Sequence, residues 1–157
     1  MKDAKKLDLD NYLPYLVNRV GNIIADQFGE EALAPHGLSI AMWRVMAALA
    51  STGGQRQIDL ADLTSIDAST LSRLVSRLVR MGVVTRTRST SSNREVVVKL
   101  SPKGQTLVGR LIPIALEYGS QATSGVSAAD LAIVKRCLRR MYANMKTRQL
   151  SLASAAQ

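Results

Sequence analysis

The chain has 157 residues, 46% of them hydrophobic, which is enough for one domain with a sizeable core and too few for two ordinary enzyme domains. Its 21 Lys and Arg against 12 Asp and Glu give a net charge of +9, which indicates a polyanionic partner, either nucleic acid or an anionic membrane surface. The single cysteine excludes an internal disulfide, and no apolar run reaches the roughly 18–20 residues of a membrane span. Because the charged start is not followed by an apolar signal segment, we expect a soluble, cytoplasmic protein.

The positive charge is concentrated in the middle of the chain. Residues 1–54 have a net charge of −1, whereas residues 68–103 carry eight Lys and Arg against one Glu. A basic run is commonly a solvated face. It becomes a binding surface when the basic residues lie on the outer face of an element whose inner face is buried.

Apolar residues at steps of three and four predict a first helix over residues 10–29, with Asp10 as its N-cap and Gly29 at its end. A breaker cluster at 34–37 separates it from a second helix, which starts at Ser39 and stops before the loop at 51–54. A short helical pattern covers 58–64 and ends in a tight polar turn.

The next helix is predicted over residues 68–81, with Asp67 as N-cap and Gly82 as C-cap. Its apolar residues fall on one side, and small hydroxyl residues and arginines occupy the other: Ser69, Thr70, Ser72, Arg73, Ser76, Arg77 and Arg80. After this helix the sequence changes from the helical period of 3.6 residues to an alternating, strand-like period of two. Residues 83–88 and 95–100 are β-branched, and the polar link between them predicts a hairpin.

A further helix opens at Pro102, and Pro113 within it predicts a kink or a break. The last helix begins at Ser127 with a pattern that resembles a capping box. The first and last helices carry apolar residues in a regular three-four rhythm, which favours packing between subunits: Leu13, Leu16, Val20, Leu131, Val134, Leu138, Met141 and Met145. The low-complexity tail, 151–157, is predicted to be disordered.

Two helices joined by a tight turn and followed by a hairpin are typical of a winged helix-turn-helix, in which the second helix enters the DNA major groove. The predicted fold class is therefore mainly α with a small β-hairpin wing (α+β). The residues expected to face DNA are Ser69, Thr70, Ser72, Arg73, Ser76, Arg77 and Arg94, with Gln57 as a phosphate contact and with Arg86 and Arg88 as either contacts or solvated strand charges.

Between residues 38 and 104 the chain resembles the MarR (multiple antibiotic resistance regulator) family. The motifs that carry the resemblance are Leu38-Ser39 and Trp43, Leu60-Ala61, the run 69–75, Gly82-Val83-Val84 with Arg86, Asn93-Arg94, and the run 100–104. Within them, Ser72-Arg73 matches the family's Thr-Arg in the recognition helix, and Arg94 matches its wing arginine. The chain departs from the family at Ser92, where an acidic residue usually braces that arginine.

The resemblance implies an obligate homodimer built from terminal helices, a pseudo-palindromic operator in double-stranded DNA, and an effector cleft between the dimerisation and DNA-binding regions. We accordingly divide the chain into dimerisation helices (1–37 and 104–150) and a winged helix-turn-helix domain (38–103). His36 and Trp43 are the residues expected to line the cleft, which would take a small apolar or aromatic effector.

The expected function is a ligand-responsive transcriptional regulator, more in keeping with a repressor than an activator. The alternative is an architectural, nucleoid-type DNA-binding protein without effector control. We expect no enzyme activity, cofactor or metal, because His36 is the only histidine and no metal-binding or phosphate-binding motif is present. Cys137 flanks the last apolar stripe and is expected to be packed rather than to sense oxidants.

Overall fold

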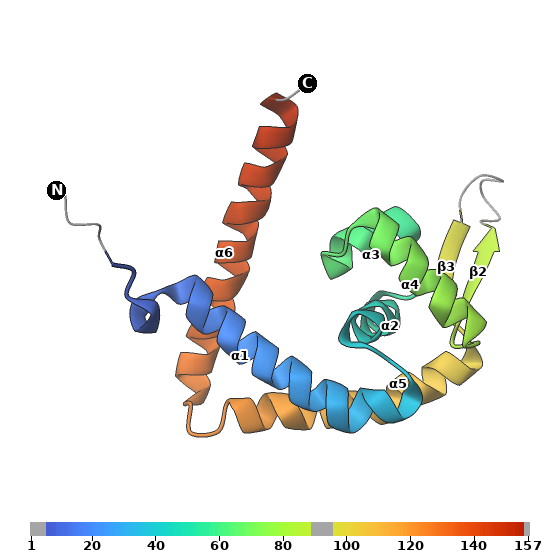
Figure 1. The fold of residues 1–157 in the computed structure, drawn as a ribbon, viewed down its shortest axis with the longest axis horizontal. Helices are drawn as coiled ribbons and strands as arrows, with labels where there is room; N and C mark the ends of the chain where they lie inside the picture. Colours follow the sequence, from blue (N-terminus) through green and yellow to red (C-terminus); the bar gives the residue numbers. More distant parts are fainter. Residues whose placement is uncertain (1–5, 89–95, 156–157) are drawn as a thin grey trace. The chain divides into compact units, whose positions relative to one another are not determined.

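A computed structural model describes residues 6–88 and 96–155, which fall into two compact units, up to Gly119 and from Ser120 (Figure 1). The α-helices are α1 (Leu13–Phe28), α2 (Ile40–Thr52), α3 (Gln57–Thr64), α4 (Ala68–Arg80), α5 (Pro102–Ala122) and α6 (Ala128–Ala155). The strands are β1 (Gln55–Arg56), β2 (Val84–Arg88) and β3 (Val96–Leu100). No helix in the described part of the chain is long and apolar enough to cross a membrane.

The segment between α1 and α2 consists of short helical turns rather than an extended loop. Instead of a simple breaker, a π-helical turn (Gly29–Leu33) and a 3-10 turn (Ala34–His36) lead to Gly37, whose positive φ of 66° ends the segment. Asp10 does not cap α1 as expected. It lies in a 3-10 turn before the helix, and Asp8 accepts the backbone N–H of Asp10.

The hairpin forms part of a three-stranded antiparallel sheet in the order β1-β3-β2. Val84 pairs with Leu100 at the base, and Arg88 pairs with Val96 toward the tip. The predicted strands are confirmed to within a residue at their starts, but β1 was not predicted. It comprises two residues, Gln55 and Arg56, which pair with β3 through the backbone and leave no pattern in the sequence.

One apolar core holds the first unit together. It joins the end of α1, the turn that follows it, α2, α3, α4, the sheet and the first half of α5. Its fully buried side chains include Met42, Val45, Leu60, Leu71, Val75, Leu78, Val98 and Leu111. The apolar side of α4 packs against α2, and this contact leaves the opposite side of α4 at the surface.

The start of α5 is anchored to the end of α4. The Ser101 hydroxyl donates to the Gly82 carbonyl at 2.7 Å and accepts the Gly104 amide at 3.0 Å. Lys103 donates to the Met81 carbonyl at 3.0 Å, which places a cation at the helix C-terminus, where the dipole favours one. Gly104 is buried so tightly that a Cβ there would lie 1.9 Å from the carbonyl oxygen of Val83.

A second anchor joins the end of α1 to α5. Phe28 makes edge-to-face ring contacts with Trp43 at 5.3 Å and with Tyr118 at 5.7 Å between centroids. The Tyr118 hydroxyl donates to Glu31 at 2.5 Å, and this hydrogen bond raises the pKa of Tyr118 to about 12. Trp43 is therefore half-buried and packs against the core.

The expectation of a kink or a break at Pro113 is decided only as far as the break: α5 is continuous from Pro102 to Ala122. Two other expectations for the C-terminal part are wrong. We expected residues 151–157 to be disordered, but residues 151–155 belong to α6 and continue its helical hydrogen bonding. Residues 156–157 lie outside the described part of the chain. Cys137 is exposed in the chain rather than packed. The capping pattern at Ser127 is confirmed, since its hydroxyl accepts the Asp130 amide at 3.1 Å.

The close approach at Gly104 predicts a strong effect of a single methyl group. Gly104→Ala should destabilise the fold by about 3 kcal/mol or more, because the obstacle is a backbone carbonyl that cannot turn aside. Gly109→Ala in the same helix is the matched control. A Cβ there meets nothing within 4 Å, so alanine should be neutral or stabilise the helix by roughly 0.5–1 kcal/mol. Urea unfolding followed by circular dichroism compares the two, and equal effects would contradict the packing described at Gly104.

Candidate nucleic-acid interface

The helix that would enter DNA, α4, is fixed at its start by Asp67. The Asp67 carboxylate accepts the Thr70 amide at 2.9 Å and the Ser69 hydroxyl at 2.7 Å. These hydrogen bonds, that of the Thr70 amide first, hold the pKa of Asp67 well below its ordinary value of 3.8. The cap satisfies orphan donors of the first turn and sets the orientation of the helix after the tight turn.

The outward side of α4 forms a concave surface together with β2. We call it the α4 groove, and its lining residues are Thr70, Ser72, Arg73, Leu74, Ser76, Arg77, Val79, Arg80 and Arg86. Four of these residues are arginines, and none of the described lining residues is acidic. The hydroxyls and guanidinium groups are the donors and acceptors that read base edges and phosphates.

The groove brings together most of the residues that the sequence singled out. Ser69 lies beside it at the start of α4, exposed and bonded to Asp67. Arg73 is exposed and donates to the Thr70 hydroxyl at 3.3 Å, one turn back along the helix. Arg88 lies at the end of β2, and Arg94 and Ser92 lie outside the described residues. Arg80 belongs to the groove although it was not among the predicted contacts; its place on the polar side of the helix was the available signal.

Arg86 is placed in a way that the sequence did not indicate. It was expected to be either a DNA contact or a solvated strand charge. In the structure its Nη2 donates to the Ser72 carbonyl at 3.2 Å and to the Ser76 hydroxyl at 3.1 Å, across from β2 to α4. Ser76 in turn donates to the Ser72 carbonyl at 2.8 Å.

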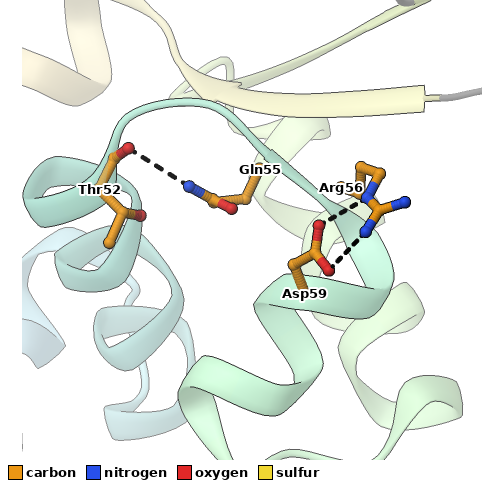
Figure 2. Close-up of polar contacts among 4 residues, drawn as sticks. All are labelled: Thr52, Gln55, Arg56 and Asp59. Atoms are coloured by element: carbon orange, nitrogen blue, oxygen red, sulfur yellow. Dashed lines mark hydrogen bonds and ion pairs between the residues drawn. The ribbon is translucent and has the colours of Figure 1, made fainter.

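Gln57, the predicted phosphate contact, is the first residue of α3, apart from the α4 groove. The chain leading into it is held by an ion pair (Figure 2): Arg56 binds Asp59 through two hydrogen bonds, at 2.6 and 2.9 Å. The hydrogen bond from Arg56 lowers the pKa of Asp59. Gln55 also donates to the Thr52 carbonyl at 3.3 Å, which ties β1 to the end of α2 (Figure 2).

A second hollow, of about 580 Å³, lies in the same unit at the junction of α4 and α5. Its floor is apolar and its rim is basic, and it is lined by His36, Met81, Val83, Lys103, Thr106, Leu107 and Arg110. His36 is thus in a cavity, whereas Trp43 is not among the lining residues and packs on Phe28 instead. Within residues 6–88 and 96–155, no group of three or more His, Cys, Asp or Glu could hold a metal ion.

The predicted subunit-packing residues are mostly at the surface of the chain. Leu13, Leu16 and Val20 of α1 are exposed, as are the four from Val134 onward in α6, and Leu131 is half-buried. Seven large apolar side chains open to water on two helices are unusual for surfaces that stay solvated.

A capped, arginine-lined helix beside a short antiparallel hairpin defines a winged helix-turn-helix of the DNA-binding class. Residues 38–96 match the MarR family. An HTH-type transcriptional repressor of Mycobacterium tuberculosis is 25% identical over 132 residues, which are 84% of this chain and 94% of that protein.

Solved structures agree with this assignment. A MarR family transcriptional regulator from Silicibacter pomeroyi superposes with a TM-score of 0.79 at 28% identity, over 91% of this chain and 96% of that one. Bordetella bronchiseptica BpsR, whose DNA binding is regulated by 6-hydroxynicotinic acid, shares the fold with a TM-score of 0.73 at 24% identity, over 83% of this chain and 98% of that one. The similarity to the MarR family of transcriptional regulators thus covers residues 38–96 by the sequence pattern of the family and 91% of the chain by the fold of one of its members.

The cap at Asp67 predicts a pH dependence of stability. Because the pKa of Asp67 is lowered in the folded state, its charge stabilises the fold above the ordinary value of 3.8, and that contribution is lost as the pH falls toward the folded-state pKa. Asp67→Asn keeps an acceptor but cannot ionise. At neutral pH this variant should unfold at a lower urea concentration than the wild type. The difference between the two urea midpoints should become smaller below about pH 4. A gap that widens in acid would show that the carboxylate charge does not stabilise the cap.

Proposed function

We propose that the protein is a transcriptional repressor that binds a pseudo-palindromic operator as a homodimer and releases it when a small effector binds. The observation that carries the proposal is the α4 groove. A helix whose inner side is buried presents four arginines and several hydroxyls on a surface with no described acidic residue. The match of residues 38–96 to the MarR family supports the same function.

In this proposal α4 lies in the major groove of DNA and α3 braces it across the backbone. Thr70 and Arg73 lie near the start of α4, where a recognition helix reaches base edges, and Ser69 lies beside them. Arg77 and Arg80 lie farther along the same groove and would neutralise phosphates. Gln57 adds a phosphate contact from α3, and Arg88 and Arg94 are proposed contacts of the wing.

The dimer would be built from the exposed apolar residues of α1 and α6. Burying a large aliphatic side chain contributes about 1.5–3 kcal/mol, so several such residues favour association strongly. A two-fold dimer presents two α4 helices, which fit half-sites about one helical turn of DNA apart or a multiple of it.

The effector site would be the hollow that His36 lines. Its apolar floor, formed by Met81, Val83 and Leu107, fits a small apolar or aromatic body. Lys103 and Arg110 on its rim favour a ligand that also carries a negative charge. The small-molecule regulation of BpsR supports such a site in this fold. An effector would release DNA by linkage if it binds better to a dimer in which the spacing of the two α4 helices does not match the operator half-sites.

Selection from randomised oligonucleotides tests the function. We expect enrichment of one two-fold symmetric sequence, because a dimer of recognition helices reads two inverted half-sites. Enrichment of a single half-site would contradict the dimer. Recovery of no consensus would favour the architectural alternative, which binds through phosphates and DNA shape.

Arg73→Ala tests the recognition helix. The variant should bind the selected operator more weakly by about 1–3 kcal/mol and lose discrimination at one or two base pairs. Arg19→Ala, which removes the same charge from α1, is the matched control and should bind like the wild type. Fluorescence anisotropy on operator and base-substituted duplexes measures both. Wild-type affinity of Arg73→Ala would exclude a base contact for this residue.

A paired ligand screen tests the effector site. Small aromatic carboxylates should release the operator from the protein, because Lys103 and Arg110 bind their negative charge. The corresponding neutral amides should release it less effectively. Arg110→Ala should raise the carboxylate concentration needed about tenfold and leave operator affinity unchanged. Equal activity of acids and amides, or no effect of Arg110→Ala, would place the effector elsewhere.

A further inference from the structure

Two side chains and one backbone carbonyl at the junction of wing and recognition helix form one network, and its central group is the Arg86 guanidinium. β2 alternates, and Val84, two residues before Arg86, is buried against the core. Val98, which pairs with Arg86 across the hairpin, is also fully buried. The pleat therefore directs Arg86 to the inner face of the sheet, toward α4.

The guanidinium bridges the sheet and the helix. It donates to the Ser72 carbonyl at 3.2 Å and to the Ser76 hydroxyl at 3.1 Å, and these two residues are one helical turn apart. The Ser76 hydroxyl has one hydrogen, which it donates to the Ser72 carbonyl at 2.8 Å. The Ser76 hydroxyl thus accepts a hydrogen bond from Arg86 and donates its own hydrogen to a carbonyl of the same helix.

We propose that Arg86 is a positioning residue that fixes the wing strand to the recognition helix, so that both meet DNA in one geometry. Ser76 acts with Arg86 rather than as a base contact, and the direct contacts of the groove come from Thr70, Arg73, Arg77 and Arg80. This assignment rests on the proposed DNA-binding function. It departs from the expectation that Ser76 faces DNA and from both alternatives expected for Arg86, a DNA contact or a solvated strand charge.

The salt dependence of operator binding separates positioning from phosphate contact. Each neutralised phosphate contributes a slope of about −0.9 to log K against log salt concentration. Arg86→Ala should weaken operator binding by about tenfold at every salt concentration with the wild-type slope. Arg77→Ala, the matched control in the same groove, should make the slope shallower by about 0.9. A slope that becomes shallower in Arg86→Ala by that amount would overturn the proposal.

Arg86→Lys and a double-mutant cycle test the network itself. Lysine keeps the charge but not the planar fork of donors, so Arg86→Lys should resemble Arg86→Ala if position matters and the wild type if charge matters. Arg86→Ala combined with Ser76→Ala should bind no more weakly than Arg86→Ala alone, because both changes break one network. Additive losses would mean that Ser76 and Arg86 act separately and would overturn the proposal.

Hydrogen exchange without DNA makes the test independent of the proposed function. In Arg86→Lys, amides of β2 and of α4 near Ser76 should exchange at least threefold faster than in the wild type, while those of α2 should not change. Unchanged exchange in β2 and α4 would overturn the positioning role even if operator binding were altered. Faster exchange in a protein that binds no operator would reject the proposed function and leave the wing-to-helix bridge in place.

Discussion

The burial of one side of α4 against α2 is the contact on which the rest of the molecule depends. Leu71, Val75 and Leu78 are completely buried, and burying each contributes about 1.5–3 kcal/mol. With that side fixed, the helical period leaves Arg73, Arg77 and Arg80 on the other side. The apolar contacts that stabilise the domain thus also place the basic residues of α4 on its outer side, where they line the α4 groove.

The contacts around this core show which features local sequence can predict. The helical and alternating periods of residues 68–100 are local patterns, and they located α4, β2 and β3 to within a residue at their starts. The cap at Asp67 was predicted for the same reason, because its partners lie two and three residues away.

Features that depend on distant residues were missed. β1 exists because Gln55 and Arg56 pair with β3, some forty residues later. The bridge from Arg86 to Ser72 joins residues 14 apart in sequence. A cleft was expected at His36, but the other residues that line the hollow, from 81–83 and 103–110, were not predicted. The helical end of α6 was missed for another reason, since low-complexity sequence rich in alanine is compatible with a helix as well as with disorder.

The anchorage of α5 to the end of α4 has a mechanical consequence. Ser101, Lys103 and Gly104 hold the first turn of α5 to residues 81–83, so α5 has little freedom to pivot without moving the recognition helix. The 18 residues of α5 that belong to the first unit, 102–119, are about 27 Å long. As a lever of that length, they convert a rotation of about 10° at the junction into a displacement of about 5 Å at Gly119. The reverse also holds, so the angle of α4 is sensitive to any partner that holds the distal part of α5.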